Sequence, residues 1–377
     1  MNESSMQHWG RRDFMKALGI GLALRTPGTV LADSEGNTSS PKMPTESFID
    51  FLKAYGEACP PSLVYRDGQD FRAWQREFRQ RLEELRGPLP DRVDPEVEVL
   101  ERVELTDHQR LLIRFPVTRF SRAVGYLLLP NGLDRGERRP GIIALHGHHE
   151  GGIETICGVR QTDYDPYALR AVRAGFVVLA PAWWGWPGRN GHVERAGDRD
   201  KCNVAQMAAS MYGIHVLNLH VQDGQAAIDV LSSRPEVAPD RIGCIGNSYG
   251  GRTTMWLTVF DERIKACVPA GCMNHFRERS LKLSSCAIQY FHGLLRYGDV
   301  QEVFSLIAPR AMQLQAGKGD GLITNRDRDM IKTVVEKAYR LRKAGAKLEY
   351  VLHEKGHQLA WDSAEPFLRK HLRLTKD

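Results

Sequence analysis

A serine between glycines is the first feature of the sequence that predicts catalysis. Residues Gly246–Gly251 form a G-x-S-x-G motif that follows the apolar segment 241–246 and precedes an expected helix near 249–258. A sharp strand-to-helix turn lifts the Oγ of Ser248 clear of the sheet and aims the backbone N–H of Tyr249 at an oxyanion. The motif alone also occurs as a structural glycine turn. The flanking strand and helix favour a nucleophile here.

A serine hydroxyl is a poor nucleophile until a base takes its proton. Asp320 follows an expected strand, 311–316, and His357 follows the next one, 347–352. Both residues therefore fall at the carboxyl ends of strands, where α/β sheets collect their active residues. We predict that His357 is the general base and that Asp320 orients it. The alternatives are an ordinary turn residue for Asp320, a surface location for His357, and Asp327 as a weaker candidate acid.

The loop after the expected strand 141–146 is the candidate second side of an oxyanion hole. It reads His-Gly-His-His-Glu-Gly-Gly from His146 to Gly152. We predict the backbone N–H of His148 as the donor, with that of Gly147 as the next candidate. The histidines also resemble the start of a di-zinc hydrolase motif. The acid and the histidine that such a motif requires are displaced, so we expect no metal and no cofactor.

Three tryptophans follow the expected strand 176–180. Trp183, Trp184 and Trp186 lie in a loop at the same edge of the sheet, where their rings can stack on a sugar. We predict them as substrate-binding residues. The alternative is that they pack in the core, as aromatic side chains most often do.

Alternating strands and helices must position all these residues. After a meander of three expected strands, short apolar runs alternate with helical segments, which is typical of a mostly parallel sheet covered by helices on both faces. The expected strands are 97–105, 110–117, 123–129, 141–146, 176–180, 241–246, 264–269, 311–316 and 347–352, and the longest expected helix is 204–232. We therefore predict the α/β class.

The first 32 residues have the pattern of an export signal. Arg11 and Arg12 precede the apolar run Ala17–Leu24, and small residues end the segment at Ala32. This order predicts a twin-arginine signal peptide, recognised by the twin-arginine export machinery, and a periplasmic or secreted protein. An amphipathic N-terminal helix is the alternative. We predict three parts: residues 1–32 as signal, 33–94 as linker and helical extension, and 95–377 as catalytic domain.

Composition excludes some partners. The net charge is +6, but the basic residues are dispersed among acidic ones, so we expect no nucleic-acid partner. No apolar stretch reaches the length of about 20 residues that a membrane span needs. The seven cysteines have no zinc-like spacing. Cys272 with Cys286 is a candidate disulfide, whereas Cys244 and Cys267 are expected to be buried.

The chain resembles the acetyl xylan esterase-like branch of the dienelactone hydrolase group over roughly residues 95–372. The matching segments are His146-Gly147, 165–168, 234–237, 241–243, 246–251, 261–266, 307–310, Asp320 and Gly356-His357. The resemblance implies the α/β-hydrolase fold, metal-free ester hydrolysis and a triad of Ser248, Asp320 and His357. Two features depart from the group. Dienelactone hydrolases proper use a cysteine nucleophile, and many relatives carry Asp and Arg where this chain has residues 182–185.

These features predict a serine-dependent carboxylic-ester hydrolase that forms an acyl-enzyme. Together with the resemblance, the tryptophans and the signal pattern suggest a secreted esterase that removes small acyl groups from carbohydrate. One alternative is a serine peptidase like the prolyl peptidases, whose domains share this residue order, although no propeller domain is evident here. Another is a non-catalytic binding protein on the same fold, which an intact Ser-His-Asp set disfavours.

Overall fold

The structure is a computed structural model that describes residues 47–186, 189, 201–281 and 286–375. The expected signal segment 1–32 lies outside the described residues. The chain divides into two units, Met1–Pro60 and Pro61–Asp377. In the first unit, helix α2 (Phe48–Ala58) begins after Ser47, whose Oγ accepts a hydrogen bond from the N–H of Asp50 at 3.1 Å. Among the described residues, no helix combines the length and apolar character needed to cross a bilayer.

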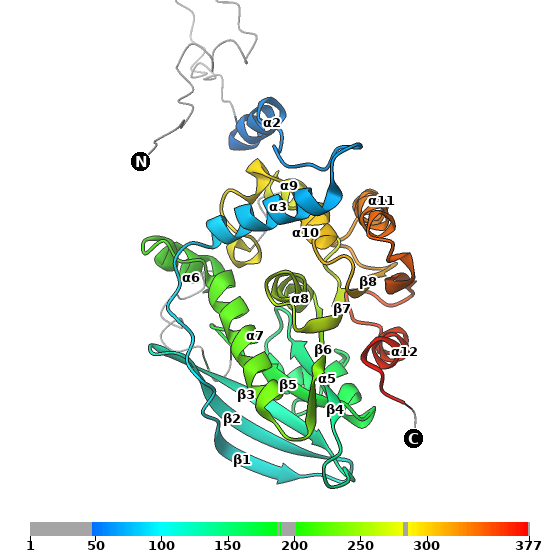
Figure 1. Cartoon of the computed structure of the whole chain (residues 1–377). Coiled ribbons are helices and arrows are strands. Elements are labelled where there is room, and N and C mark those ends of the chain that lie inside the picture. Colours follow the sequence, from blue (N-terminus) through cyan, green and yellow to red (C-terminus); the bar gives the residue numbers. More distant parts are fainter. Residues whose placement is uncertain (1–46, 187–188, 190–200, 282–285, 376–377) are drawn as a thin grey trace, which may run out of the picture. The chain divides into compact units, whose positions relative to one another are not determined.

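A nine-stranded sheet organises the second unit (Figure 1). Its strand order is β1-β2-β3-β5-β4-β6-β7-β8-β9. The first three strands form an antiparallel meander, β3 pairs antiparallel with β5, and every later pair is parallel. The strands are β1 (Glu98–Glu104), β2 (His108–Thr118), β3 (Ser121–Pro130), β4 (Arg139–Leu145), β5 (Val177–Pro181), β6 (Val237–Asn247), β7 (Ile264–Ala270), β8 (Ala311–Gly317) and β9 (Leu348–His353).

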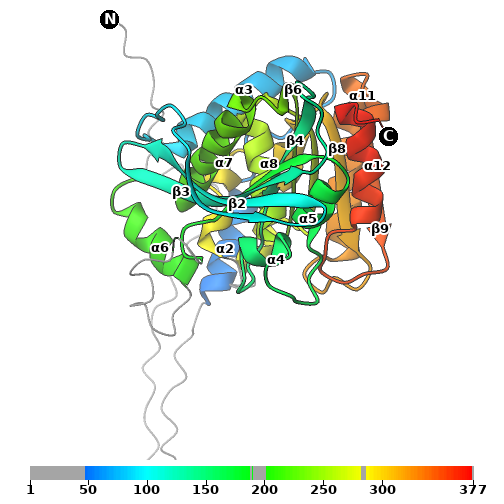
Figure 2. The same cartoon turned by 90° about the horizontal axis from the view of Figure 1, so that it is seen from below.

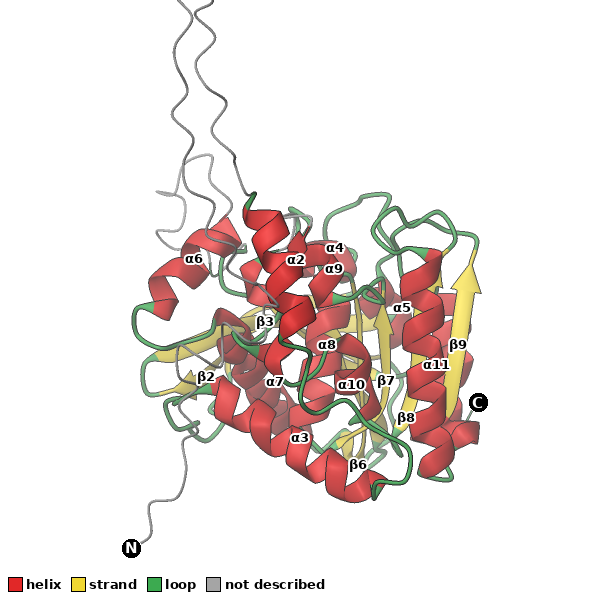
Figure 3. Cartoon of the chain, turned by 90° about the horizontal axis from the view of Figure 1, so that it is seen from above, coloured by secondary structure: helices red, strands yellow, loops and turns green. Residues whose placement is uncertain are grey.

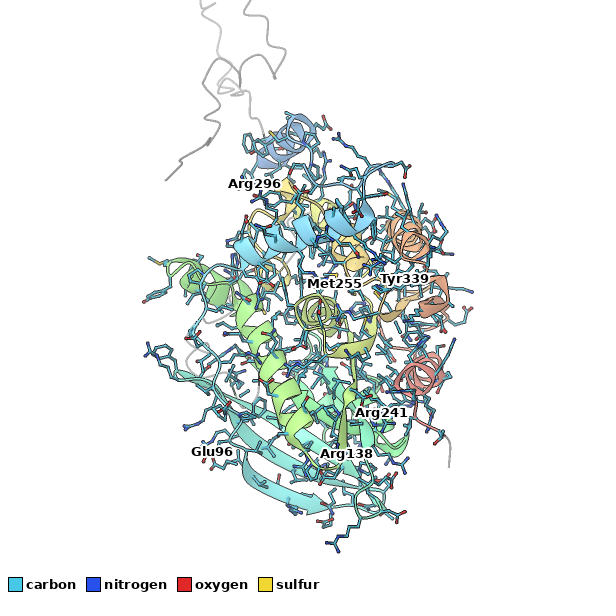
Figure 4. The ribbon with its side chains drawn as sticks, viewed as in Figure 1. Glu96, Arg138, Arg241, Met255, Arg296 and Tyr339 are labelled. Carbon is cyan, nitrogen blue, oxygen red and sulfur yellow. The ribbon has the colours of Figure 1, made fainter. Side chains whose placement is uncertain are left out.

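Helices cover both faces of the sheet, as the alternating pattern predicts (Figures 1 and 2). One apolar core joins the sheet to α3 (Phe71–Arg86), α7 (Val216–Ser233), α8 (Tyr249–Phe260), α10 (Val300–Ser305) and α11 (Asn325–Leu341). A second core, on the other face, includes α4 (Ile153–Ile156), α5 (Tyr167–Arg173) and α12 (Trp361–Leu372). Figure 3 shows α11 beside β9. Figure 4 labels Met255 on α8 and Tyr339 on α11, two buried residues of the first core.

Helix α3 joins the first core through one apolar stripe. Phe71, Trp74, Phe78 and Leu82 are buried at spacings of three and four, and a helix with this period places them on one face. The side chain of Gln75 extends the contact, because its Nε2 donates to the backbone oxygens of Ser305 at 2.9 Å and Ala308 at 3.0 Å. The helix is therefore part of the second unit and of its core.

The prediction of one continuous helix over 204–232 is wrong. The structure has two helices there, α6 (Lys201–Ser210) and α7 (Val216–Ser233). Gly213 adopts a φ of 70°, and the N–H of Ile214 donates to the oxygen of Ala209 at 3.1 Å, which closes α6 with a left-handed cap. An isolated glycine in an apolar pattern is tolerated in many helices, so the sequence alone did not mark this break.

Candidate active site

Ser248 stands at the junction of β6 and α8, where the motif predicted it. Its φ and ψ are 61° and −121°, a conformation that non-glycine residues rarely adopt. The neighbouring glycines make this turn possible. A Cβ on Gly246 would lie 2.4 Å from the oxygen of Gly250, and one on Gly250 would lie 1.9 Å from the oxygen of Leu145. The half-buried Ser248 is thus held on a strained turn at the carboxyl edge of the sheet.

His357 and Asp320 are brought together by the loops after β9 and β8. The Nδ1 of His357 lies 2.7 Å from Oδ2 of Asp320, whose side chain is fully buried. The other carboxylate oxygen accepts from the N–H of Leu322 at 2.9 Å. A carboxylate at Nδ1 selects the tautomer with its proton on that nitrogen, which leaves Nε2 as an acceptor. Among the described residues, this Nε2 is buried without a hydrogen-bond partner.

The nucleophile turn and the histidine ring converge on Gly271, which follows β7. A Cβ on Gly271 would lie 3.1 Å from Cε1 of His357 and 3.2 Å from the backbone nitrogen of Ser248. The N–H of Ser248 donates to the oxygen of Ala270 at 2.9 Å, which ties the turn to the end of β7. The Cε1 edge of the His357 ring and the turn that carries the Ser248 hydroxyl therefore lie close together beside Gly271.

Asn247 links the two loops, and the sequence analysis did not single it out. Its Nδ2 donates to the backbone oxygen of His357 at 3.1 Å and to the hydroxyl of Tyr164 at 2.8 Å. Burial raises the pKa of Tyr164, so the phenol keeps its proton. The only local signal for Asn247 is its place directly before the serine, since both of its partners are remote in sequence.

The loop after β4 packs directly against the nucleophile turn. A Cβ on Gly147 would lie 3.1 Å from Cβ of Ser248 and 2.9 Å from the oxygen of Asn247. The next residue, His148, is exposed. On the opposite side, Tyr249 opens α8, so its N–H has no carbonyl from an earlier helical turn. The three predicted oxyanion donors thus lie on the two segments that enclose the serine.

A second buried residue, His220 on α7, fixes the side chain of Tyr249. Its Nδ1 lies 2.5 Å from the tyrosine hydroxyl, which is also 3.3 Å from the oxygen of Ile288. Burial lowers the pKa of His220 well below its ordinary value, so the ring is neutral. This residue has no signal in the sequence, because a lone histidine in a helix forms no pattern.

The comparisons with known proteins agree with this architecture. The Dienelactone hydrolase family matches residues 137–295. "Putative hydrolase YtaP" of Bacillus subtilis (strain 168) is 27% identical over 288 residues, which cover 74% of this chain and 93% of that protein. A structure described as a putative acetyl xylan esterase from Bacteroides fragilis NCTC 9343 superposes with a TM-score of 0.66 at 19% identity, covering 82% of each chain. A glucuronoyl esterase from Solibacter usitatus gives a TM-score of 0.62 at 16% identity, covering 83% of this chain and 97% of the other.

The chain has the α/β-hydrolase fold. The predicted fold class is therefore confirmed, with a mostly parallel sheet and helices on both faces. The two solved esterase structures share the fold with this chain, and residues 137–295 are similar to the Dienelactone hydrolase family.

The three tryptophans of the predicted substrate-binding set differ in their surroundings. Trp183 is fully buried, and its Nε1 donates to the oxygen of His146 at 3.1 Å. Trp186 is 9% exposed and donates from Nε1 to the oxygen of His149 at 3.0 Å. Trp184 is half-buried. Trp183 and Trp186 therefore both pack in the core and support the histidine-rich loop, while Trp184 alone of the three is partly exposed.

A buried ion pair anchors the tryptophan loop to α7. Arg189 pairs with Asp223, and it also donates to the oxygen of Ala182 at 3.2 Å. Its guanidinium lies 3.8 Å from the centre of the Trp184 ring. Burial raises the pKa of Asp223 to about 6, and the nearby Arg189 opposes that rise. The pair therefore ties the tryptophan loop to α7.

The structure argues against the di-zinc interpretation of the histidine-rich loop. Both ring nitrogens of His146 are occupied: Nδ1 lies 2.9 Å from the oxygen of Gly147, and Nε2 accepts from the N–H of Trp183 at 3.2 Å. Burial lowers the pKa of His146 to about 3, so the ring is neutral. With no lone pair to spare, this histidine holds the loop and cannot ligate a metal.

Asp327, the weaker candidate acid, belongs to a different pair. Its Oδ1 lies 2.6 Å from Nδ1 of His275, and its Oδ2 accepts from the hydroxyl of Thr324 at 2.7 Å. Burial acts against ionisation, but the hydrogen bonds from His275 and Thr324 lower the pKa of Asp327. This carboxylate caps α11 and holds the loop after β7. Of the two candidate acids, only Asp320 therefore pairs with His357.

The cysteines are arranged differently from the expected pair. None of the seven forms a disulfide, and Cys272 is buried behind the nucleophile helix. Cys286 instead clusters with Cys202 and His148, with their ligand atoms all within 4.8 Å of one another. A hydrogen bond from Cys202 lowers the pKa of Cys286 to about 6; burial opposes this, and His148 adds to it. The cluster stands beside the candidate oxyanion loop.

Proposed function

We propose that this α/β-hydrolase is a serine-dependent carboxylic-ester hydrolase. One observation carries the proposal: the imidazole of His357, paired at Nδ1 with buried Asp320 and without a partner at Nε2, stands against the strained turn of Ser248. Acyl transfer requires a nucleophilic hydroxyl, a base that can accept its proton, and backbone N–H donors for the oxyanion. The turn of Ser248, Nε2 of His357 and the two segments beside the serine supply these groups.

The proposed reaction has two halves. The Oγ of Ser248 attacks the ester carbonyl while Nε2 of His357 takes the hydroxyl proton, and the carbonyl oxygen gains the negative charge. The N–H groups of Tyr249 and His148, with Gly147 as the alternative, stabilise that oxyanion. The tetrahedral intermediate collapses, and the alcohol leaves with the proton from His357. Water then repeats the sequence on the acyl-enzyme, and the acid is released with the serine restored.

Asp320 serves as the positioning residue of this scheme. Its carboxylate holds the Nδ1 proton of His357 and stabilises the imidazolium that forms in each half. Because its side chain is buried, water competes little for that interaction.

We infer a small acyl ester on carbohydrate as the substrate class. Trp184 is half-buried, and the ring of Trp186 packs against the exposed His148 of the histidine-rich loop with centroids 5.4 Å apart; aromatic rings can stack on sugars. The similar structure described as a putative acetyl xylan esterase supports the same class. Trp183 is left out of the substrate-binding set because of its burial.

The function is tested by labelling and by acid release. The full chain is treated with a fluorophosphonate probe and assayed on acetylated sugars, methyl esters, aryl esters and peptides. We expect Ser248-dependent labelling and acid release from acetylated sugars, both lost in Ser248→Ala and both kept in Ser233→Ala, a serine at the end of α7. Activity that persists in Ser248→Ala would remove the nucleophile assignment, and Ser248-dependent cleavage of peptides alone would replace the esterase with a peptidase.

Export to the periplasm or medium by the twin-arginine machinery is proposed from the sequence of residues 11–32. The test is the double variant Arg11→Lys, Arg12→Lys, expressed in a bacterium with this export route. We expect the variant to stay in the cytoplasm while the wild type is exported and shortened at its N-terminus. Equal export of both would overturn the proposal.

A further inference from the structure

Three donor atoms converge beside the candidate oxyanion loop from segments that are remote in sequence. They are Nε2 of His148 in the loop after β4, Sγ of Cys202 near the start of α6, and Sγ of Cys286, the residue before the short helix η2 (Ala287–Gln289). All three lie within 4.8 Å of one another, and Cys202 Sγ is 3.3 Å from His148 Nε2. Among the described residues, this is the one set of three that could hold a metal ion.

The chemistry of these donors selects a class of ion. Two thiolates and one imidazole suit Zn²⁺ or Cu⁺, whereas Mg²⁺ and Ca²⁺ require oxygen ligands, which this set lacks. In a tetrahedral zinc site with Zn–S of about 2.3 Å and Zn–N of about 2.0 Å, the ligand atoms stand roughly 3.5–3.8 Å apart. The observed separations need to change by only about 1 Å to reach that geometry.

The segments that carry the ligands are already held in place. Oδ1 of Asn203, next to Cys202, accepts a hydrogen bond from the N–H of Ala287, next to Cys286, at 2.8 Å. The ring of His148 packs on Tyr249 with centroids 4.7 Å apart. Metal binding therefore needs to order few additional residues. Contacts between ligand-bearing residues and their neighbours keep the ligands oriented in metal sites.

We propose that Nε2 of His148 and the Sγ atoms of Cys202 and Cys286 bind one Zn²⁺ ion, with water in the fourth position. Each thiol releases its proton when it ligates the ion. The site clamps the loop after β4 to α6 and η2. It shares His148 with the di-zinc interpretation but uses neither His146 nor His149, and it revises the sequence expectation that this chain holds no metal.

The site is tested by titrating the reduced, chelator-stripped full chain with Zn²⁺ against a chromophoric chelator, and with Co²⁺ by absorption. We expect one equivalent of either ion, a thiolate-to-Co²⁺ charge-transfer band, and a zinc-dependent rise in the unfolding temperature. Cys202→Ser and Cys286→Ser are each expected to weaken binding at least 10-fold, whereas Cys59→Ser, on the exposed cysteine after α2, keeps it.

Two results would overturn this site. One is the absence of stoichiometric binding by the reduced wild type, a measurement that does not depend on any variant folding. The other is wild-type affinity in Cys202→Ser and Cys286→Ser, once circular dichroism has shown that both fold. Neither readout involves Ser248, so failure of the metal site and failure of the proposed hydrolase function are separable.

Discussion

The side chain of Asn247 joins the turn that carries Ser248 to the loop that carries the base, because its Nδ2 donates to the backbone oxygen of His357 at 3.1 Å. The same nitrogen donates to the hydroxyl of Tyr164 at 2.8 Å. One buried amide thus holds two loops that must stay aligned for proton transfer, and misplacement of reacting groups by about 1 Å can cost on the order of 100-fold in rate.

Replacement of this amide is expected to slow the chemical step. In Asn247→Ala both hydrogen bonds are lost, so we expect kcat on an ester substrate to fall about 10- to 100-fold with little change in KM. Tyr164→Phe removes only one of the two acceptors and is expected to have the smaller effect. A kcat for Asn247→Ala that matches the wild type would show that the link does not position the base.

The two buried carboxylates near the candidate site are expected to differ in importance. Asp320→Asn keeps the shape of the side chain but no longer holds the Nδ1 proton of His357, and tautomer loss of this kind costs on the order of 10³–10⁴ in kcat. Asp327→Asn alters the partner of His275 and should reduce kcat much less. Steady-state kinetics of both variants decide the matter, and the reverse order of effects would transfer the orienting role to Asp327.

Some of the candidate site could be predicted because its signals are local. A glycine before Ser248 is required by a contact within one turn, because a Cβ on Gly246 would meet the oxygen of Gly250 at 2.4 Å. The strand-and-loop order likewise placed Asp320 and His357 at the same edge of the sheet. Both signals follow from backbone geometry, which sequence patterns report directly.

Other features depend on contacts between remote segments. Cys272 was a candidate disulfide partner of Cys286, but α6 brings Cys202 to Cys286 instead, and no local pattern encodes that approach. The burial of Trp183 has the same origin, since a tryptophan after a strand can face either the core or the solvent. His220 is a further example, because its role depends on where α7 crosses α8.

The strain at the nucleophile predicts a variant that is inactive yet more stable. Ser248 has a φ of 61° and a ψ of −121°, a conformation that only glycine adopts without cost. Ser248→Gly should therefore exceed Ser248→Ala in its free energy of unfolding by about 1 kcal/mol. Urea denaturation of the two variants measures this difference. Equal stabilities would mean that the turn carries no such strain.

A titratable residue far from the nucleophile predicts how stability depends on pH. Glu302 is 3% exposed, and its Oε2 accepts from the N–H of Asp299 at 2.8 Å in the capping box of α10. Burial raises the pKa of Glu302 to about 7, and the carboxylate of Asp299 adds to this rise. The folded protein therefore holds this proton more tightly than the unfolded chain does.

The sign of the effect follows from this difference. Between pH 4.5 and about 7 the unfolded chain binds fewer protons at this position, so the contribution of Glu302 to the free energy of unfolding falls as the pH rises, by at most about 3 kcal/mol. Glu302→Gln cannot titrate, and its Oε1 can still accept from Asp299. We expect the denaturation midpoint of Glu302→Gln not to decrease in this way between pH 4.5 and about 7. Glu77→Gln, on the exposed face of α3, should show the same decrease as the wild type. If Glu302→Gln follows the wild-type curve across this range, another group must cause the pH dependence.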